Sequence, residues 1–387
     1  MLSDLAFGLA QRRHRVTVIT SRLRYDAPDE LLPARETAGD VDIIRVWTSQ
    51  FGRGHLALRA LDYLTFYVSA AFALWLQARR GDIVIAKTDP PMLSVVVAPI
   101  ARLRGAKLVN WLQDIFPEVA QALGVGGGRS GLGYRVLRGL RNQSLRRAAM
   151  NVAIGDRMAE RLMGLQVDPA RIRCIPNWAS CDAIKPVEPN HNRLREHWGL
   201  TGKFVAGYSG NLGRAHEIET LLGAIQRVEG RADLAMVRWL FIGGGALFET
   251  MRHEAQARGL TSISFRPYQP REQLAESLSA ADVHLVSLRP ELEGLIVPSK
   301  FYGVAAAGRP TLFIGDADGE IARLVARYAC GLTVAAGDSE ALAARVAALA
   351  QEPNLARDMG RRARIMCEAH FDTSQAVTTW EELFKVL

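Results

Sequence analysis

Short apolar segments rich in β-branched residues alternate with segments of helical periodicity along almost the whole chain. This alternation is typical of parallel sheets wrapped by helices, because such strands are buried on both faces. In the first half we expect strands at Arg15–Thr20, Asp42–Val46, Asp82–Ala86, Lys107–Leu112, Met150–Ala153 and Ile172–Ile175. In the second half we expect strands at Phe204–Ser209, Val237–Ile242, Ile263–Pro267, Val283–Ser287, Thr311–Ile314 and Gly331–Val334. The pattern predicts an α/β protein with two doubly wound units.

The boundary between the two units is expected within residues 180–192, which carry two prolines and little periodicity. We predict an N-terminal Rossmann-like domain at residues 1–182 and a C-terminal Rossmann-like domain at residues 183–370. Residues 371–387 are expected to form a C-terminal helix that packs back on the first domain. Ligands of such sheets bind at the carboxyl ends of the strands, so we expect the two domains to face each other across an active-site cleft.

The chain starts with a helical pattern at residues 2–12 and not with a strand. A sheet of this type ordinarily opens with an apolar strand and a glycine-rich turn. The segment Arg15–Thr20 looks like the second strand of such a sheet, so its first, central strand is expected to be missing. Two explanations stay open: either translation begins at Met1, or Met1 is an internal methionine of a longer protein.

Residues 293–310 form the most informative segment, because their pattern is typical of a loop that presents a helix N-terminus to an anion. Pro298 fits the first turn of a helix, Ser299 and Lys300 follow in that turn, and Gly308 ends the helix. Free N–H groups, the positive end of the helix dipole and a nearby lysine suit a phosphate group. Helices that bind nothing can begin in the same way, so the segment alone leaves both interpretations open.

The composition is that of an ordinary globular protein, with 49% hydrophobic and 23% charged residues among 387. Intrinsic disorder is therefore excluded as a description of the chain. The cysteines have neither the spacing of a zinc site nor that of a disulfide framework, so a reducing cytoplasm fits best. They are Cys174, Cys181, Cys330 and Cys367.

Positive charge is concentrated in residues 1–150, which hold 21 Lys and Arg against 12 Asp and Glu, while the rest of the chain holds 27 against 28. This asymmetry indicates an anionic partner. An anionic membrane surface fits better than a nucleic acid, because basic and aromatic residues do not interleave as in a nucleic-acid-binding module. We therefore expect no nucleic acid as a partner.

Two segments are candidates for contact with a membrane. The apolar run Leu64–Leu76 is shorter than the roughly 20 residues of a spanning helix, so it is either a core helix or a helix in the bilayer interface, with Tyr67 and Trp75 as interfacial aromatic residues. A second predicted helix carries Arg135, Arg138, Arg141, Arg146 and Arg147. It is either a solvated basic face or a surface that rests on anionic headgroups. With no signal peptide visible, we expect a cytoplasmic protein, peripheral on the inner face of the cytoplasmic membrane.

Several motifs follow one another at expected strand-to-helix turns: Trp111–Glu118, Ile175–Trp178, Tyr208–His216, Phe241–Gly245 and Ala281–Val283. In their order and spacing, over nearly all 387 residues, the chain resembles family 4 glycosyltransferases of the GT-B fold. It is most similar to bacterial surface-polysaccharide enzymes of the fucosamine transferase and colanic acid type. The resemblance implies that the first domain binds the acceptor and the second binds a nucleotide sugar.

The residues expected to hold the nucleotide sugar lie on glycine-rich turns and in the segment 293–310. Glycines after a strand let the backbone approach a ligand closely, and neighbouring cations suit a diphosphate. Arg214 and His216 are expected to supply positive charge near the diphosphate. Where the family usually has an arginine and a lysine, this chain has Asn211 and His216, so Arg214 is the candidate to replace the arginine's charge. The full predicted set is Gly210, Asn211, Gly213, Arg214, His216, Gly244, Arg266, Gly294, Leu295, Ser299 and Lys300.

Asp114 and Glu293 are the two candidate catalytic carboxylates. Asp114 follows the strand Lys107–Leu112, where a carboxylate can orient or deprotonate an acceptor hydroxyl, and it is also a natural N-cap for the next helix. The resemblance implies a pair of glutamates at the positions of Leu295 and Gly303, and neither residue is acidic here. Glu293 is a shifted candidate for the first of them.

The resemblance implies transfer of a sugar, an N-acetylated or deoxy hexose, from a UDP-sugar to a polyprenyl-diphosphate-linked saccharide. The product would be O-antigen, capsule or exopolysaccharide, and the anomeric configuration would be retained. Helix dipole and cations would stabilise the leaving diphosphate, so neither a metal nor another cofactor is expected. Two alternatives stay open: a nucleotide-sugar 2-epimerase of the same fold, and a catalytically inactive binding subunit.

Overall fold

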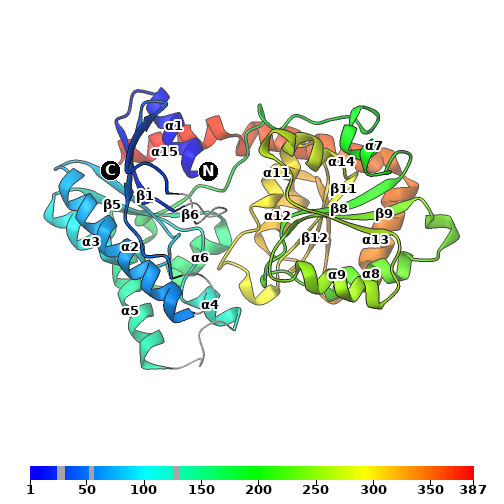
Figure 1. The fold of residues 1–387 in the computed structure, drawn as a ribbon, viewed down its shortest axis with the longest axis horizontal. Helices are drawn as coiled ribbons and strands as arrows, with labels where there is room; N and C mark the ends of the chain where they lie inside the picture. Colours follow the sequence, from blue (N-terminus) through cyan, green and yellow to red (C-terminus); the bar gives the residue numbers. More distant parts are fainter. Residues whose placement is uncertain (24–30, 52–55, 125–130) are drawn as a thin grey trace. The chain divides into compact units, whose positions relative to one another are not determined.

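The protein is organised in two compact units: unit 1 comprises Met1–Pro176 and Ala376–Leu387, and unit 2 comprises Asn177–Gln375. Each unit has parallel strands with helices packed on them (Figure 1), which confirms the predicted α/β fold class. The computed structural model describes residues 1–23, 31–51, 56–124 and 131–387.

The strands of unit 1 form two separate sheets. The described strands are β1 (Val16–Ser21), β2 (Arg35–Ala38), β3 (Val41–Val46), β4 (Ile83–Lys87), β5 (Lys107–Trp111), β6 (Met150–Ala153) and β7 (Ile172–Cys174). One sheet has the order β1-β3-β2 and the other β4-β5-β6-β7. All pairs are parallel except β2 with β3. In the described part of unit 1, no strand pairs with the second edge of β1 or of β4.

All six strands predicted for the first half are present, with ends that agree to within one residue. The break between β1 and β4 agrees with the expectation that a central strand is missing. The residues of β1 and β4 are mostly half-buried, whereas β6 and nearly all of β5 are buried. β2 was not predicted, because its residues Arg35-Glu-Thr-Ala38 lack apolar alternation and are held only by antiparallel pairing with β3.

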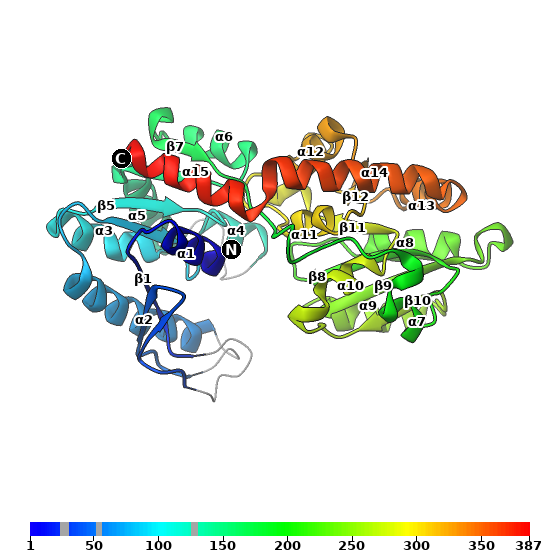
Figure 2. The same ribbon diagram turned by 90° about the horizontal axis from the view of Figure 1, so that it is seen from above.

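The helices of unit 1 are α1 (Leu2–Gln11), α2 (Leu56–Gln77), α3 (Leu93–Leu103), α4 (Glu118–Ala122), α5 (Leu132–Arg147), α6 (Asp156–Gly164) and most of α15 (Thr373–Lys385), with a 3-10 turn at Pro169–Arg171. α3 packs against both α2 and α5. α15 lies beside α1 in both views (Figures 1 and 2), where Arg12 pairs with Glu381 at 3.0 Å. Trp380 of α15 also packs on Trp111 of β5, with ring centroids 5.2 Å apart.

α2 combines the two interpretations offered for the run Leu64–Leu76. One side of the helix packs into unit 1, and the other side is exposed. Tyr67 lies on the packed side, where its hydroxyl donates to the carbonyl of Pro91, so it is not an interfacial residue. Among the helices of the described chain, none has the length and apolar character needed to cross a bilayer.

The strands of unit 2 form one parallel sheet with the order β10-β9-β8-β11-β12-β13. They are β8 (Phe204–Asn211), β9 (Val237–Gly244), β10 (Ile263–Arg266), β11 (Val283–Ser287), β12 (Thr311–Ile314) and β13 (Gly331–Val334). All six were predicted. Tyr208, Trp239 and Phe241 fill the centre of the core, and the rings of Tyr208 and Phe241 stack at 5.7 Å. This core fixes the carboxyl ends of β8 and β9.

Helices pack on the sheet of unit 2 (Figure 1). They are α7 (Arg193–His197), α8 (Glu219–Val228), α9 (Phe248–Ala257), α10 (Leu274–Ser279), α11 (Lys300–Ala306), α12 (Glu320–Tyr328), α13 (Ser339–Gln351) and α14 (Pro353–Met366). Single 3-10 turns lie at Pro189–His191, Ala232–Leu234, Arg271–Gln273 and Pro290–Leu292, and a π-helical turn follows α14 at Cys367–Phe371.

The division between the units falls before Asn177 and after Gln375, whereas the sequence suggested divisions after residues 182 and 370. Backbone pairing explains the difference. The N–H of Ala179 donates to the carbonyl of Phe371 at 3.0 Å, and the N–H of Cys181 donates to Asp372 Oδ1 at 2.8 Å. These bonds tie the first connecting residues and the segment after α14 to unit 2.

Candidate active site

Three loops of unit 2 meet where the neighbouring strands β9, β8 and β11 end. The loop after β8 carries Gly210–His216, the loop after β9 carries Gly243–Gly245, and the loop after β11 leads through residues 288–299 into α11. Carboxyl ends of parallel strands are the usual binding edge of such a sheet. The structure thus brings together most of the residues predicted to hold a nucleotide sugar.

Glycines allow the ends of β8 and β9 to approach each other closely. A Cβ on Gly243 would lie 2.2 Å from the carbonyl oxygen of Gly210, and a Cβ on Gly245 would lie 2.2 Å from Asn211 Oδ1. Both distances exclude a side chain. Gly243 has φ +136° and Gly245 φ +121°, which also require glycine. The N–H of Leu212 then donates to the carbonyl of Gly244 at 2.7 Å and joins the two loops.

Lys300 places an ammonium group among these loops. Its Nζ lies 3.8 Å from the ring centroid of Tyr208 and donates to the Tyr208 hydroxyl and, at 3.3 Å, to the carbonyl of Asn211. Burial holds the pKa of Lys300 well below its usual value. In the described part of the chain, Lys300 forms no ion pair with a carboxylate. A nearby negative charge favours the ammonium form again, so a lysine in this setting is suited to bind an anionic ligand.

His216 accepts a hydrogen bond from Lys300. Its Nδ1 lies 2.7 Å from the carbonyl oxygen of Ser287, which can only accept, so Nδ1 carries the proton. Nε2 is then free to accept from Lys300 Nζ at 3.3 Å. Burial and the charge of Lys300 lower the pKa of His216 to about 3. His216 is therefore neutral near pH 7 and orients Lys300, instead of supplying the positive charge that the sequence suggested.

Arg214 is exposed at the turn after Gly213. A second arginine that the sequence analysis overlooked, Arg289, lies beside this turn: its N–H donates to the carbonyl of Ala215 at 3.0 Å. The side chain of Arg289 pairs with Glu291. The loops after β8 and β11 are thus joined by main-chain bonds and together present two guanidinium groups.

At the end of β10, an arginine and a tyrosine lie next to the glycine turn. The guanidinium of Arg266 lies 5.8 Å from the ring centroid of Trp198. The ring of Tyr268 is 59% exposed, and its edge lies 3.2 Å from where a Cβ on Gly244 would be. An exposed aromatic ring beside a bare backbone turn can stack on a planar ligand. Tyr268 was missed as a site residue because the sequence does not show that it folds back over Gly244.

Glu293 serves the architecture of the loop before α11. Its side chain is 5% exposed, and its Oε1 accepts from the N–H of Glu320, the first residue of α12, at 2.8 Å. Gly319, the N-cap of α12, packs against this carboxylate so closely that a Cβ would lie 2.6 Å from Oε2. A carboxylate at a helix N-terminus is also favoured by the helix dipole. The carboxylate of Glu293 thus ties the loop to α12.

The remaining predicted residues of this loop differ in exposure. Gly294 has φ +73° and shapes the turn after Glu293, and Leu295 is buried. Ser299 is exposed and is the N-cap of α11, which begins at Lys300, two residues after Pro298. The hydroxyl of Ser299 does not cap the helix.

Asp114 lies in unit 1, directly after β5. The hydroxyl of Thr88 accepts from the backbone N–H groups of Gln113, at 2.8 Å, and Asp114, at 3.3 Å. Burial, and then the charge of Asp89, raise the pKa of Asp114 to about 6, against the opposing effects of Lys87 and Thr88. One oxygen, Oδ1, is buried without a hydrogen-bond partner in the described structure. A carboxylate with a pKa close to neutrality is suited to accept a proton.

The alternative role for Asp114, an N-cap, is wrong. α4 begins at Glu118, its N-cap is Pro117, and no side chain caps it. Glu118 is itself occupied by an ion pair with Arg141. Arg141 is buried in that pair, so it does not belong to the basic face expected on α5.

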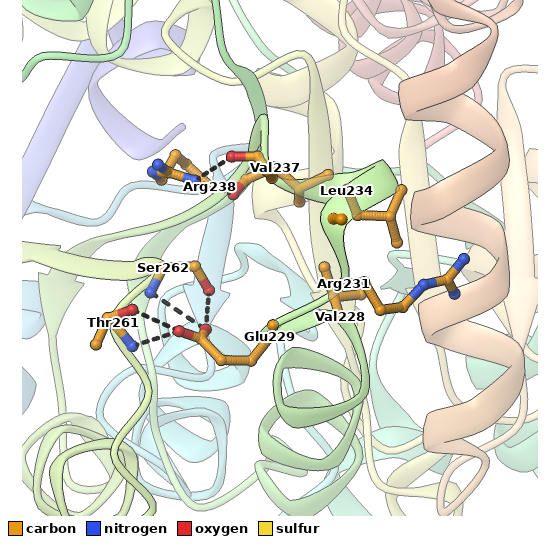
Figure 3. Close-up of a pocket in the computed structure, with 11 residues that line it drawn as sticks. Val228, Glu229, Arg231, Leu234, Val237, Arg238, Thr261 and Ser262 are labelled. Carbon is orange, nitrogen blue, oxygen red and sulfur yellow. Dashed lines mark hydrogen bonds between the residues drawn. The ribbon is translucent and has the colours of Figure 1, made fainter.

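A separate hollow of about 220 Å³ lies at the opposite end of the sheet, where β9 begins (Figure 3). The carboxylate of Glu229 borders it and accepts from the N–H and hydroxyl of Thr261, at 2.9 and 2.5 Å, and from those of Ser262. Its acceptor capacity is therefore used by the protein itself. Because ligands of parallel sheets bind at the carboxyl ends of the strands, this hollow is not the candidate site.

The described residues contain no group of three or more His, Cys, Asp or Glu side chains placed to hold a metal ion. The groups that the fold does place together at the carboxyl edge are one ammonium, two guanidinium groups, an exposed aromatic ring and three glycine-shaped turns. This arrangement can bind an anionic ligand that also has a planar ring.

Comparisons with known proteins agree with the α/β fold of the two units. Residues 1–178 match the family described as "Glycosyl transferase 4-like domain", and residues 190–366 match "Glycosyl transferases group 1". A probable glycosyltransferase, WbjE of Pseudomonas aeruginosa, is 33% identical over 268 residues, which make up 69% of this chain and 66% of the relative.

Solved structures show the same fold at low sequence identity. Sucrose-phosphate synthase from Thermosynechococcus elongatus has a TM-score of 0.78 at 19% identity, over 100% of this chain and 92% of that one. HepE from Anabaena, solved in complex with UDP, has a TM-score of 0.69 at 15% identity, over 90% of this chain and 86% of that one. WaaG, a glycosyltransferase involved in lipopolysaccharide biosynthesis, has a TM-score of 0.71 at 16% identity, over 99% of this chain and 94% of that one. By its fold and by the order of its two matched domains, the chain belongs to the glycosyltransferases of the GT-B fold.

Proposed function

We propose that the protein transfers a sugar from a UDP-sugar to a hydroxyl of a polyprenyl-diphosphate-linked saccharide. The observation that carries the proposal is the ammonium of Lys300, which lies among three glycine-shaped loops with no carboxylate paired to it in the described chain. A diphosphate supplies the missing negative charge. Its departure from the sugar builds further charge on the leaving oxygen, which a fixed cation stabilises in the transition state.

The neighbouring groups complete a donor site in this proposal. The exposed Arg214 and the half-buried Arg289 provide further charge for the diphosphate, and the backbone turn at Gly243–Gly245 lets the ligand approach the sheet edge. Tyr268 offers its ring to the uracil base, next to Arg266. The crystal structures of HepE with UDP and with UDP-glucose support this choice of donor, because a protein of the same fold binds it.

In the same proposal Asp114 acts on the acceptor. With a pKa of about 6, its carboxylate is mostly ionised at pH 7 and remains basic enough to accept or share the proton of a hydroxyl. Glu293 acts as a positioning residue, because its carboxylate holds the loop before Lys300 against α12. The reaction proposed needs no metal ion and retains the anomeric configuration. The acceptor hydroxyl gives its proton to Asp114, and the phosphate leaves with the electron pair of its broken bond to the sugar.

A lipid-linked acceptor is held in a membrane, so sugar transfer to it takes place at the membrane surface. We propose that the protein is peripheral on the inner face of the cytoplasmic membrane and contributes to a surface polysaccharide. The excess of nine positive charges in residues 1–150 supports an anionic membrane surface as partner, since it is confined to the half of the chain that carries unit 1. The match to a probable glycosyltransferase and the likeness to WaaG are compatible with such a pathway.

A catalytically inactive binding subunit remains the second candidate, because Gly303 stands where the family pattern has a glutamate. Gly303 lies within α11, and the nearest side-chain atom to a Cβ there is Leu278 Cδ1 at 3.5 Å, so the residue provides no carboxylate for a ribose. In this alternative, the donor site binds UDP and no sugar is transferred.

Calorimetric titration with UDP, followed by a transfer assay with lipid-linked saccharides and mass spectrometry, tests the proposal. We expect UDP to bind, and Lys300→Met to weaken binding at least tenfold, as the loss of a charged hydrogen bond implies. Lys185→Met, at an exposed lysine of the same unit, is the matched control. A folded protein that does not bind UDP refutes the donor site, and UDP binding without transfer to any acceptor favours the binding subunit.

A further inference from the structure

We propose that α2 is an in-plane membrane anchor whose outer face inserts into the interfacial layer of an anionic lipid bilayer. This anchor deepens the proposed function and rests on it in one respect: a lipid-linked acceptor is what would require binding to a membrane. The observations that support it are a stripe of exposed apolar side chains on α2 and the cations and tryptophan at the end of that helix.

The two sides of α2 differ in burial but not in polarity. The packed side carries Phe66, Ala70, Ala73 and Leu74. The outer side carries large apolar residues at helical spacing: Leu61, Leu64, Val68, Phe72, Trp75 and Leu76. From residue 63 to residue 78 the helix and its end contain no charged side chain. A solvent-facing helix normally places charged and polar groups outward. A continuous apolar stripe on the surface therefore marks a contact with another apolar phase.

The dimensions of α2 suit a helix that lies flat in an interface. Its 22 residues extend over about 33 Å at 1.5 Å per residue. Because one side is packed on unit 1 from Phe66 to Ala78, the helix cannot be surrounded by lipid. Only the outer side can enter the bilayer, to the depth of roughly 5–10 Å that is typical of interfacial amphipathic helices.

The carboxyl end of α2 is bordered by positive charge. Arg79 and Arg80 follow the helix, and Arg102 at the end of α3 is exposed beside the apolar Leu103. The guanidinium of Arg104 lies 5.4 Å from the ring centroid of Trp75. A tryptophan with neighbouring arginines is typical of the level of the lipid headgroups. The apolar stripe and the cations thus match the two layers of an anionic membrane surface.

Charge favours a membrane over a second copy of the chain as the occupant. Residues 1–150 carry 21 basic against 12 acidic residues, so pairing two copies through α2 would bring two positively charged halves together. Anionic headgroups attract the same surface, at about 1 kcal/mol per basic residue close to the membrane, a factor of roughly five in affinity.

Vesicle flotation of the full chain, without donor or acceptor, tests the anchor. We expect binding to phosphatidylglycerol-containing vesicles, weaker binding to pure phosphatidylcholine, and loss with rising salt. Phe72→Glu should lower the partition coefficient by roughly tenfold or more, which is the effect of burying one large apolar side chain. The matched control is Ile365→Glu in unit 2, because Ile365 is 64% exposed and Phe72 is 65% exposed. Arg80→Gln with Arg102→Gln should reduce binding about fivefold per charge.

A second measurement uses the native side chains. Lipids brominated in the acyl chains should quench tryptophan fluorescence of the wild-type chain and quench Trp75→Phe much less, which places Trp75 in the interface. Equal flotation of Phe72→Glu and Ile365→Glu overturns the proposal, as does a dimer that Phe72→Glu dissociates while vesicles bind nothing. UDP affinity, measured on the same samples, reports on the donor site in unit 2. Vesicle binding without UDP binding would therefore keep the anchor and refute the proposed function.

Discussion

Asp114 is predicted to destabilise the protein at neutral pH, and Asp114→Asn should remove that cost. Its pKa is raised from 3.8 to about 6 in the folded protein, so between these values the folded state binds more protons than the unfolded state. Stability therefore falls as the pH rises through this range. At 1.36 kcal/mol per pKa unit, the full loss above pH 7 is at most about 3 kcal/mol. Asparagine cannot ionise, so the variant escapes this loss.

The assay compares thermal unfolding of the wild type and Asp114→Asn between pH 4 and pH 8. The substitution can also change stability by an amount that does not depend on pH. Beyond that amount, the free energy of unfolding of Asp114→Asn should exceed that of the wild type by about 3 kcal/mol at pH 8, by about half as much at pH 5 and by under 1 kcal/mol at pH 4. Because the units can unfold separately, the transition is followed through the tryptophans of unit 1. Transfer activity should fall at least a hundredfold.

The matched control is Asp156→Asn, at an exposed carboxylate in the first turn of α6 in the same unit. Because its carboxylate is exposed, Asp156→Asn should not show a gain of about 3 kcal/mol between pH 4 and pH 8. If Asp114→Asn changed the free energy of unfolding by a constant amount at every pH, burial would not be acting on the carboxylate of Asp114. A variant that is stabilised at pH 8 and keeps full transfer activity would leave the burial argument intact and exclude Asp114 as a base.

Substitutions at three further positions test the donor side in unit 2. Gly243→Ala should destabilise this unit by about 2–4 kcal/mol and abolish UDP binding, because its Cβ would lie 2.2 Å from the carbonyl of Gly210 at φ +136°; a normal melting temperature would contradict this. Glu293→Gln keeps an acceptor for the N–H of Glu320, so in urea unfolding it should lower the free energy of unfolding by about 1 kcal/mol less than Glu293→Ala. Equal losses in the two variants would show that the hydrogen bond between residues 293 and 320 contributes little to stability. Tyr268→Ala should weaken UDP binding about tenfold and leave the melting temperature unchanged, and unaltered affinity would exclude stacking on the base.

The sequence predicted the strands well because each is an apolar run bounded by turn residues. It could not predict β2, since Arg35–Ala38 become a strand only through pairing with β3. The glycines at Gly210 and Gly243 were recognisable because a turn after a strand is a local feature. The partners of these turns were not, because Arg289 and Tyr268 reach them only when separate strands are assembled.

Charge states were the least predictable part of the site. His216 was expected to carry positive charge, but burial beside Lys300 makes it neutral near pH 7. Asp114 was also expected to be a natural N-cap, but the helix that follows begins too late for that contact. In each case the residue type was visible in the sequence, while its protonation or partner depends on the environment that the folded chain creates.

The break in the sheet of unit 1 has a consequence for the way this unit opens. In the described structure, no strand of the sheet β1-β3-β2 is hydrogen-bonded to a strand of the sheet β4-β5-β6-β7. The strands of one sheet can therefore separate without breaking hydrogen bonds of the other. Amide hydrogens on β1 and β2 should exchange well before those on the central strands β8 and β9 of the six-stranded sheet. Among the described residues, β1 and β4 also each have one edge on which no strand pairs, and such an edge can pair with another extended chain. The half of the molecule with the greater capacity to rearrange is therefore the half that carries Asp114 and α2.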